Sequence, residues 1–379
     1  MDSRILRIWL SQKNVISRAK AALIEDYLGS IEAVYEADPS AYAGIKEISR
    51  TCAMALCDKS LAEAEKIISD CEKLGIRILT CDDSDFPASL STLSSPVQVL
   101  YTLGTVPDWD DMLGIAVVGT RRNTEYGQVA AERISRELAE KGVTIISGMA
   151  AGIDSFALKS ALRIGAPTVA VMGCGLDSAY PPENRRLMDS IIKTGCAMSE
   201  YPPFSPPLKS HFPERNRIVC GLSDGVLAVE APYRSGTLIT TRYAKESGRT
   251  IFAVPGNIFA ANSKGTNMLI KQGAVATTCA ADILDEFPIR AARLKPFEKK
   301  EVPPKPVKEE KKTAPQFDGL DDDSRKIAEL LVEKDMHIEE IAARADMTIA
   351  ELNGILPLLE IDGIIRKLAG NIYKYNTEG

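Results

Sequence analysis

A repeated alternation of short apolar runs, glycine-containing turns and amphipathic stretches limits the fold of this chain more than any other feature. Runs at residues 115–118, 144–147 and 168–172 are each followed by a glycine turn and then a stretch of helical periodicity. Such alternation produces parallel strands joined by right-handed crossovers. The helices that complete these units are expected at 127–141, 155–164 and 184–194.

Four further apolar runs extend the pattern. They lie at residues 196–199, 225–229, 250–254 and 274–277, with one more helix at 236–245. We therefore predict an α/β fold over residues 113–287, with a doubly wound, mostly parallel sheet of about seven strands. Two strands at 77–80 and 97–103 are expected to lead into this sheet.

The segments on either side of this core have different patterns. Residues 1–75 combine capping and turn signals with amphipathic stretches, which predicts a small helical module. Residues 291–317 are rich in Pro, Lys and Glu and cannot bury a core, so we expect a linker. The predicted domains are residues 1–75, residues 76–290 with the core at 113–287, the linker, and residues 318–379.

The last domain has the pattern of a winged helix. Helices are predicted at 323–333, 338–344 and 349–361, followed by a hairpin of strands 364–367 and 372–375. The third helix carries no Lys or Arg but does carry Glu351 and Glu360, although helices that enter the major groove are usually basic. Pro357 is expected to bend or end it. We predict a protein-interaction module, with the Arg366-Lys367 wing as the alternative DNA contact.

Charge is divided unevenly along the chain. Residues 115–290 contain 20 Lys and Arg against 16 Asp and Glu, so this segment is +4, while the net charge of the whole chain is −6. A nucleic-acid partner would therefore meet the middle domain. Eight cysteines without a CxxC pair and only two histidines give no zinc pattern, and we expect reduced thiols. No run approaches the ~20 residues of a membrane span, and we expect a cytoplasmic protein without membrane contact.

Glycines follow several of the predicted strands, where backbone N–H groups and helix N-termini can face an anion. These strand ends are Gly119-Thr120-Arg121-Arg122, Ser147-Gly148 with Gly152, Gly173-Cys174-Gly175, and Ser235-Gly236-Thr237. Together they predict a crevice whose backbone N–H groups bind phosphate groups. The alternative is that the glycines only form tight turns. The dinucleotide pattern GxGxxG is missing from the first turn and no Walker lysine follows Thr237, so NAD and ATP are disfavoured and no cofactor is expected.

Cations and a ring next to these turns suit a polynucleotide. Arg121 and Arg122 stand at the first turn, and the stretch Lys209-Ser210-His211-Phe212-Pro213-Glu214-Arg215-Asn216-Arg217 combines cations, an aromatic ring and an amide. In single-strand binding, charge follows the phosphates while bases stack on rings. The competing interpretations are surface salt bridges for the arginines and a core position for Phe212 in a solvated loop.

A series of motifs in the middle domain resembles the DNA processing protein A (DprA/Smf) family. In order they are G-T-R-R-x-x-x-Y-G, S-G-x-A-x-G-I-D, G-x-G-x-D-x-x-Y-P-x-x-N, S-E-Y-P, F-P-x-R-N-R-I-x-x-G-L-S, V-E-A-x-x-x-S-G-T-L-x-T, G-R-x-x-F-A-V-P-G-N and G-T-N-x-L-I-x-x-G-A. They span residues 119–274. The resemblance implies a Rossmann-like domain. It also implies cooperative binding of single-stranded DNA, a homodimer, and loading of the recombinase RecA during natural transformation. The N-terminal helical module is expected to be SAM or helix-hairpin-helix-like, since Gly44-Ile45 would open a new helix.

The resemblance also implies DNA contacts at particular positions. Combined with the residue-level argument, the predicted DNA-binding residues are Arg121, Arg122, Gly148, Lys209, Phe212, Arg215, Asn216, Arg217, Ser235, Gly236 and Thr237. One departure is Leu158, which stands where the family commonly has a histidine, so a catalytic or metal role at that position is excluded.

Two rival functions remain. A nucleotide phosphoribohydrolase with a Rossmann-like core could use Asp154, Asp177, Glu200 and Glu230 as acid and base. Its usual Pro-Gly-Gly before the Gly-Thr turn is missing, and we expect no enzyme: Asp154 is predicted to cap the next helix and Asp177 to fix the turn before Tyr180. The other rival is a regulator that binds duplex DNA through the winged helix. The sequence leaves open whether a small nucleotide occupies the crevice.

Overall fold

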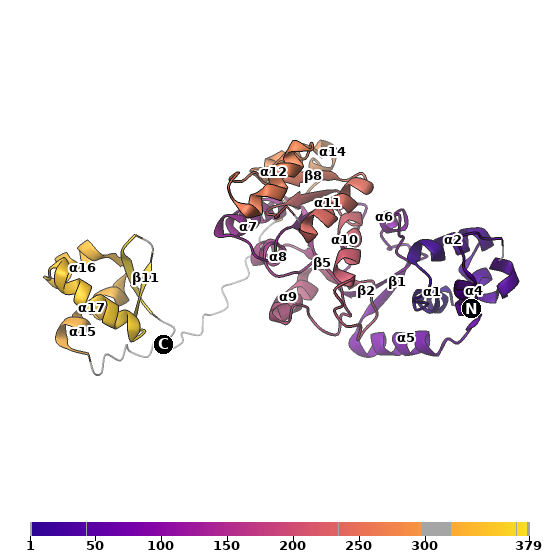
Figure 1. Ribbon diagram of the computed structural model, residues 1–379, viewed down its shortest axis with the longest axis horizontal. Helices are drawn as coiled ribbons and strands as arrows, with labels where there is room; N and C mark the ends of the chain where they lie inside the picture. Colours follow the sequence, from indigo (N-terminus) through magenta and orange to yellow (C-terminus); the bar gives the residue numbers. More distant parts are fainter. Residues whose placement is uncertain (1, 43, 234, 298–319, 369, 377–379) are drawn as a thin grey trace. The chain divides into compact units, whose positions relative to one another are not determined.

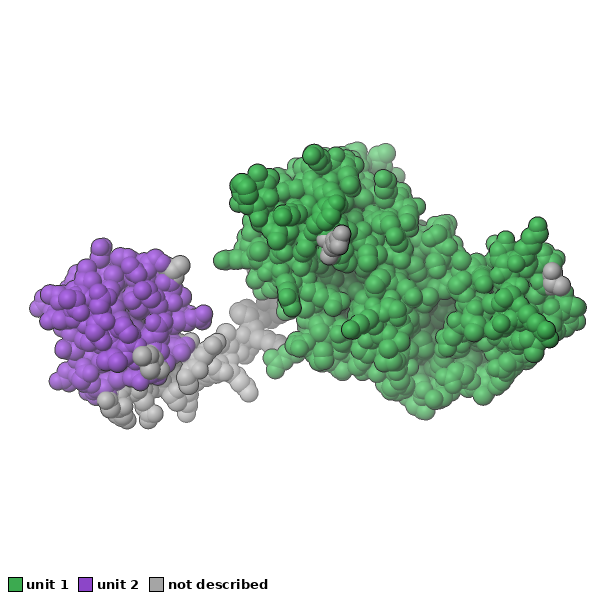
Figure 2. All heavy atoms as spheres, in the orientation of Figure 1, with its two compact units in different colours: residues 1–300 green, residues 301–379 purple. Residues whose placement is uncertain are grey.

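The structure is a computed structural model that describes residues 2–42, 44–233, 235–297, 320–368 and 370–376. The chain divides into two compact units, residues 1–300 and residues 301–379 (Figure 2). The predicted linker lies largely outside the described residues, and the predicted domain boundaries stay predictions. No helix among the described residues is long and apolar enough to cross a membrane.

A nine-stranded sheet forms the centre of the first unit (Figure 1). Its strands follow the order β1-β2-β6-β5-β4-β3-β7-β8-β9. They are β1 (Arg77–Thr80), β2 (Val99–Gly104), β3 (Gly114–Val118), β4 (Thr144–Ser147), β5 (Thr168–Met172), β6 (Cys196–Ser199), β7 (Gly225–Ala228), β8 (Thr250–Ala253) and β9 (Val275–Ala276). The strands from β6 to β9 in this order pair in parallel, while β1 and β2 add an antiparallel edge. The predicted doubly wound α/β fold is confirmed.

Helices cover both faces of this sheet because alternate residues of each buried strand point to opposite sides. On β3, Ile115 and Val117 join the core with α7 (Glu125–Glu140), α8 (Ile153–Arg163) and α9 (Arg185–Thr194). Ala116 and Val118 join the opposite core with α10 (His211–Gly221) and α11 (Gly236–Glu246). Both faces of the sheet are therefore buried under helices, as in other doubly wound sheets.

The other helices between residues 88 and 291 are shorter. They are α6 (Ala88–Ser91), the 3-10 turns Pro182–Asn184 and Ala261–Ser263, α12 (Lys264–Lys271), α13 (Ala280–Leu284) and α14 (Pro288–Ala291). After α14 the chain stays on the domain, because the backbone N–H of Phe297 donates to the carbonyl of Glu140 over 3.2 Å.

The N-terminal module contains α1 (Ser3–Ser11), α2 (Arg18–Leu28), α3 (Ile31–Glu36), a 3-10 turn (Pro39–Tyr42), α4 (Arg50–Cys57) and α5 (Ala62–Leu74). Its helices α1 to α4 begin at side-chain caps or turns and bury one apolar face.

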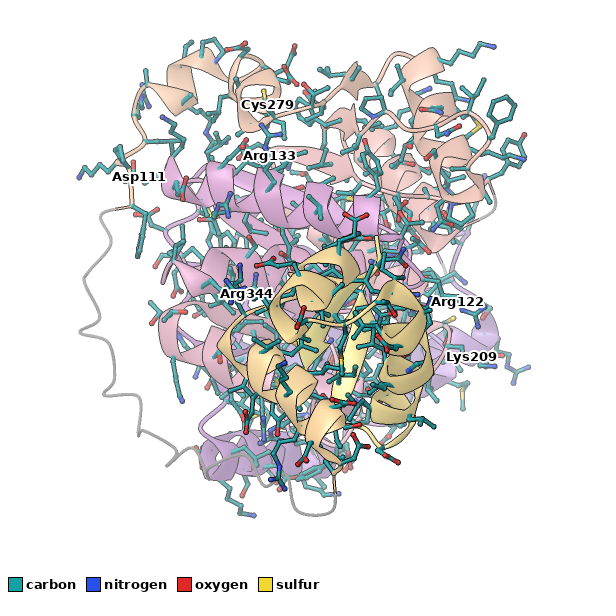
Figure 3. All side chains as sticks on the ribbon, turned by 90° about the vertical axis from the view of Figure 1, so that its left-hand side faces the viewer. Asp111, Arg122, Arg133, Lys209, Cys279 and Arg344 are labelled. Carbon is teal, nitrogen blue, oxygen red and sulfur yellow. The ribbon has the colours of Figure 1, made fainter. Side chains whose placement is uncertain are left out.

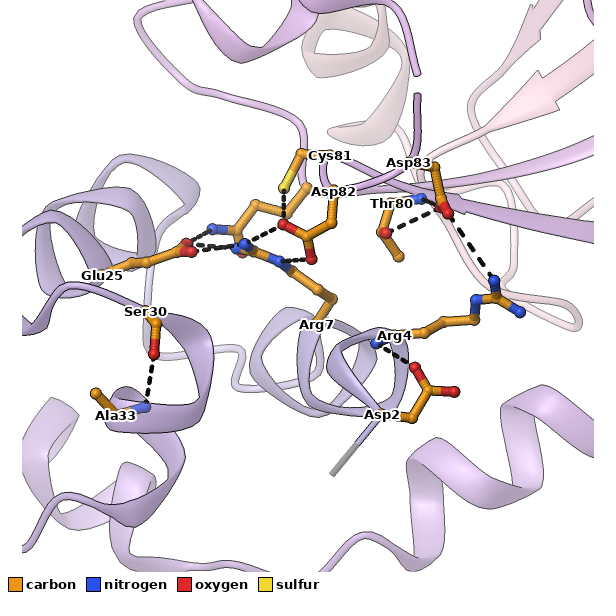
Figure 4. A network of polar contacts seen from close by, with 11 residues as sticks. Asp2, Arg4, Arg7, Glu25, Ser30, Ala33, Thr80, Cys81, Asp82 and Asp83 are labelled. Atoms are coloured by element: carbon orange, nitrogen blue, oxygen red, sulfur yellow. Dashed lines mark hydrogen bonds and ion pairs between the residues drawn. The ribbon is translucent and has the colours of Figure 1, made fainter. Parts of the chain in front are cut away.

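A buried arginine joins this module to the sheet. Arg7 on α1 is 4% exposed and donates to Glu25 on α2 and to both carboxylate oxygens of Asp82, which follows β1 (Figure 4). Gln98 donates to the same Glu25 over 3.1 Å. The hydrogen bond from Arg7 lowers the pKa of Asp82, so the carboxylate is charged at neutral pH.

The second unit has the predicted winged-helix elements. They are α15 (Asp322–Glu333), β10 (Met336–His337), α16 (Ile338–Ala345), α17 (Ile349–Ile361), β11 (Ile365–Leu368) and β12 (Ile372–Tyr375), with strand order β10-β12-β11. Pro357 does not end α17, which continues for four residues beyond it. The helix buries Leu352, Leu356 and Leu359, and this packing holds it together despite the missing N–H.

Candidate nucleic-acid interface

The sheet reverses its winding direction between β3 and β7, and ligands of such sheets bind beyond the carboxyl ends of the strands at this point. The chain runs from β3 outward to β4, β5 and β6, then returns through α10 to β7 on the other side of β3. Three loops leave the sheet here or next to it: the loop after β3, the loop after β7 and the loop after β5.

A carboxylate fills the switch point itself. Glu230 is 2% exposed, and its side chain accepts from the backbone N–H of Thr124 over 2.9 Å and from the Thr124 hydroxyl over 2.7 Å. The backbone N–H of Thr120 donates to the Glu230 carbonyl over 2.8 Å. An anion at this position disfavours a phosphate deep in the crevice, so the cations beyond it, Arg121 and Arg122, define the surface a ligand would meet.

Both arginines of the first turn are exposed, as is Lys209. Within the described parts of the chain none of these three cations forms an ion pair, so the salt-bridge interpretation has no partner to support it. Figure 3 labels Arg122 and Lys209, which fall on the same side of the first unit in that view.

Phe212 forms the aromatic part of the surface. Its ring centroid lies 5.1 Å from that of Tyr180, and the Arg121 guanidinium lies 5.4 Å above it. Gly173, after β5, lies beneath: a Cβ there would approach the Phe212 ring to 3.1 Å. The loops after β3 and β5 therefore meet at this half-buried ring, which carries a cation on one side and keeps part of its surface accessible.

Gly148 and Arg215, two of the predicted DNA-binding residues, have partners inside the protein. Gly148 is buried, its N–H donates to Asp154 over 3.2 Å, and its carbonyl accepts from Arg215 over 2.7 Å. Arg215 is 4% exposed and also donates to the carbonyl of Val171. With these polar groups engaged inside the protein, both residues can support the surface from below, and their DNA contact stays a prediction.

Asp154 and Arg215 form a buried electrostatic pair next to Gly148. Burial raises the pKa of the Asp154 carboxyl, and the charge of Arg215 opposes that change. Burial lowers the pKa of Arg215, and the charge of Asp154 opposes it. Each charge therefore opposes part of the effect that burial has on the other group. The prediction that Asp154 caps its helix is wrong, because its carboxylate accepts from the loop before α8.

Arg217, another predicted DNA-binding residue, is also buried, at 4% exposure, and has an internal partner. It donates to both carboxylate oxygens of Glu200 over 2.6 Å. Glu200 in turn accepts from Arg18 of the N-terminal module over 2.5 Å.

Asp177 was predicted to fix the turn before Tyr180. Its carboxylate instead accepts from the backbone N–H of Phe204 over 2.6 Å, which corrects that role.

The last three predicted residues open α11. Gly236 is exposed, and no atom lies within 4 Å of a Cβ built on it. Ser235 is half-buried and its hydroxyl has no hydrogen-bond partner in the described structure, whereas Thr237 is buried. The backbone at Ser235 and Gly236 is the accessible part of this helix N-terminus. Asn216 is half-buried and accepts from Arg215 Nε over 3.2 Å.

Arg18 was not predicted as a site residue, and it connects the N-terminal module to α10. Besides Glu200, its guanidinium contacts Glu214 over 3.3 Å and lies 6.0 Å above the Tyr201 ring. Tyr201 stacks on His211 with centroids 3.9 Å apart. The first turn of α10, next to Phe212, is thus held by a residue almost two hundred positions earlier in the chain, which no local sequence pattern indicates.

Replacing Arg18 with methionine is expected to lower the free energy of unfolding by about 1.5–3 kcal/mol, because the variant cannot form the charged hydrogen bonds to Glu200 and Glu214. Urea unfolding measures the change, and Arg4→Met is the control because Arg4 reaches only an exposed contact with Asp83 at 3.9 Å. Equal destabilisation of the two variants would contradict a special role for Arg18.

Three comparisons with known proteins agree on the family. The family model "DNA recombination-mediator protein A" matches residues 77–288, and the model "DprA winged helix domain" matches residues 310–371. Protein Smf of Synechocystis is 44% identical over 201 residues, 52% of this chain and 50% of that protein. The chain thus spans half the length of this relative.

Two solved structures share the fold. The X-ray structure of DNA processing protein A from Streptococcus pneumoniae has a TM-score of 0.66 and 33% identity, over 74% of this chain and 97% of that one. The protein from Helicobacter pylori, whose structure describes a single-stranded DNA binding mode, has a TM-score of 0.52 and 31% identity, over 56% and 95% of the two chains. The motifs, the doubly wound sheet and these matches agree: the chain belongs to the DNA processing protein A (DprA/Smf) family.

Proposed function

We propose that this protein binds single-stranded DNA on the surface formed by Arg121, Arg122, Lys209 and Phe212. The observation that carries the proposal is the half-buried Phe212 ring with the Arg121 guanidinium 5.4 Å above it and exposed cations in the same loops. A ring offers a stacking surface to a base while the cations attract the phosphates. The binding mode described for the Helicobacter pylori relative supports this choice of ligand.

The family suggests what the bound strand is for. We propose a non-enzymatic recombination mediator that acts as a homodimer in the cytoplasm, protects incoming DNA and loads RecA during natural transformation or homologous recombination. The carboxylates that a hydrolase would need have structural partners instead: Glu230 holds the loop after β3, and Glu200 pairs with Arg217. Release of free base from nucleoside monophosphates would contradict this part of the proposal.

Titration with oligo(dT) and with a duplex of equal length, at several salt concentrations, tests the proposal. We expect tight, salt-sensitive binding to oligo(dT), because exposed bases can stack and phosphates release counterions. Equal affinity for the duplex would overturn single-strand specificity.

Deleting residues 318–379 is expected to leave oligo(dT) affinity within about threefold, because the proposed surface lies entirely in the first unit. We propose that the winged helix binds a protein partner, since α17 exposes Leu358 (61%) and carries no basic residue. Fluorescence anisotropy of the full-length protein and of the deletion variant measures the difference in oligo(dT) affinity. Loss of all DNA binding on deletion would favour a winged-helix regulator.

A further inference from the structure

The loop after β8, residues 254–263, carries the most exposed large apolar side chain among the described residues. Phe259 is 87% exposed and its neighbour Ile258 is 73% exposed. The loop is not loose at this point, because the Phe259 N–H donates to the Asn257 side chain over 2.9 Å and the Asn267 amide donates to the Gly256 carbonyl over 2.9 Å. An aromatic side chain that is exposed on a structured loop indicates a binding site.

Hydrogen bonds join this loop to the turn that carries the arginines. The Asn262 side chain donates to the carbonyl of Arg122 over 2.8 Å, and the Asn262 carbonyl accepts from the Ala231 N–H over 2.7 Å. Ala231 itself follows Glu230, which holds the turn after β3. Asn262 therefore ties together the loops after three neighbouring strands, β3, β7 and β8.

The surface around Phe259 combines aromatic rings and cations, as does the surface around Phe212. Phe259 and Tyr233, which is 61% exposed on the loop after β7, supply rings. Arg122 is an exposed cation in the turn that Asn262 contacts, and the exposed Lys264 begins α12 directly after the loop. Exposed rings interleaved with cations suit a single strand of nucleic acid, since each base has a face that can stack.

We infer that the single-stranded DNA held at Arg121 and Phe212 continues past Arg122 and stacks a base on Phe259. Phe259 is thus a second stacking residue at the carboxyl edge of the sheet. This inference rests on the proposed function and adds to it a direction: the strand crosses the edge from β5 toward β8. Hydrogen-bonded continuity with the Arg122 turn, and the exposed cations Arg122 and Lys264 in the joined segments, favour DNA over an apolar protein partner.

Replacing Phe259 with leucine tests the inference, because leucine keeps the apolar character and removes the stacking face. With oligo(dT) of about 20 nucleotides we expect affinity to fall about fivefold or more, the lower end of the effect of one stacked base. The slope of log affinity against log salt should stay unchanged, because no phosphate-binding cation is removed. Phe259→Trp should keep the affinity, and its added tryptophan emission should be quenched by oligo(dT).

Ile289→Ala is the matched control. Ile289 is 73% exposed, like Ile258, but lies on α14, whose Arg290 donates to the Met112 carbonyl at the amino end of β3. This variant should bind as the unaltered protein does. Circular dichroism should show the same melting for Phe259→Leu, since the ring is almost fully exposed.

The outcomes separate this inference from the proposed function. If the unaltered protein fails to bind oligo(dT), the proposed function fails. If Arg121→Ala weakens binding while Phe259→Leu stays within twofold, the inference alone is overturned. If Phe259→Leu changes the sedimentation of the DNA-free protein, the ring contacts a second copy of the chain, and the inference is overturned as well.

Discussion

Replacing Arg215 with methionine is expected to lower the free energy of unfolding by about 3–5 kcal/mol, the cost of leaving a buried charge without its partner. Asp154 is 7% exposed, and the Arg215 charge is what opposes the rise in its pKa on burial. The variant also leaves the carbonyls of Gly148 and Val171 without the donors that Arg215 supplies. Urea unfolding at neutral pH measures the change.

The pH dependence of this variant has a definite sign. Without Arg215, burial raises the folded-state pKa of Asp154 further above its unfolded value of about 3.9, so the folded protein binds a proton more readily than the unfolded chain. Stability attributed to this group therefore rises as pH falls through the folded-state pKa, and the deficit relative to the unaltered protein shrinks on acidification.

A second substitution separates the effect of charge from that of packing. Asp154→Asn with Arg215→Met removes both charges while the asparagine oxygen can still accept from the Gly148 N–H. We expect this double variant to recover most of the stability, because removing both members of a buried pair is far less costly than removing one. A double variant as unstable as Arg215→Met would show that packing and the missing hydrogen bonds to backbone carbonyls dominate.

This buried pair also shows where sequence reasoning reaches its limit. The strands can be predicted because β3, β4 and β5 are short runs buried on both faces, bounded by glycines. Helix α10 is absent from the sequence-based expectations, because Pro213 and the closely spaced charges of residues 209–217 resemble a solvated loop. Proline is compatible with the first turn of a helix, where its missing N–H costs nothing.

The roles of the cations in α10 cannot be derived from their spacing. Arg215 and Arg217 are two positions apart, yet both are buried, because their partners Asp154 and Glu200 come from other elements. Lys209, just before α10, and Arg121, after β3, are exposed and fit the prediction of an accessible surface. Phe212 lies beside Arg121. Charge alone cannot separate a cation that binds a ligand from one that supports the fold; only the tertiary partner does.

Replacing both Arg121 and Lys209 with alanine is expected to weaken oligo(dT) binding about 100-fold at physiological salt, if each cation contributes about 1.4 kcal/mol. The slope of log affinity against log salt should become less steep by about 0.7 for each single-strand phosphate that is no longer neutralised, or about 1.4 for the pair. Fluorescence anisotropy at four or more salt concentrations gives both quantities, since the two side chains are exposed and their removal leaves the fold intact.

Arg163→Ala supplies the control for charge alone. Arg163 is an exposed arginine in the last turn of α8, at the opposite edge of the sheet, where its contact is Glu132 at 3.3 Å. The variant lowers the net charge by the same amount as Arg121→Ala, so a general electrostatic effect would weaken binding equally in both. An unchanged salt slope in the Arg121 and Lys209 double variant would refute direct phosphate contact by these cations.

The contact between Arg121 and Phe212 adds a test that charge cannot mimic. Phe212→Leu should weaken binding by about 1–3 kcal/mol with no change in salt slope, since a stacking face is removed and every cation is kept. Because the guanidinium lies 5.4 Å from the ring, removing either partner also disturbs the other. The effects of Arg121→Ala and Phe212→Leu should therefore not add: the double variant should be weakened by less than their sum, by about 0.5 kcal/mol or more. Strict additivity would mean that the ring and the cation contact the strand independently, whereas coupling is expected if one base is held between them.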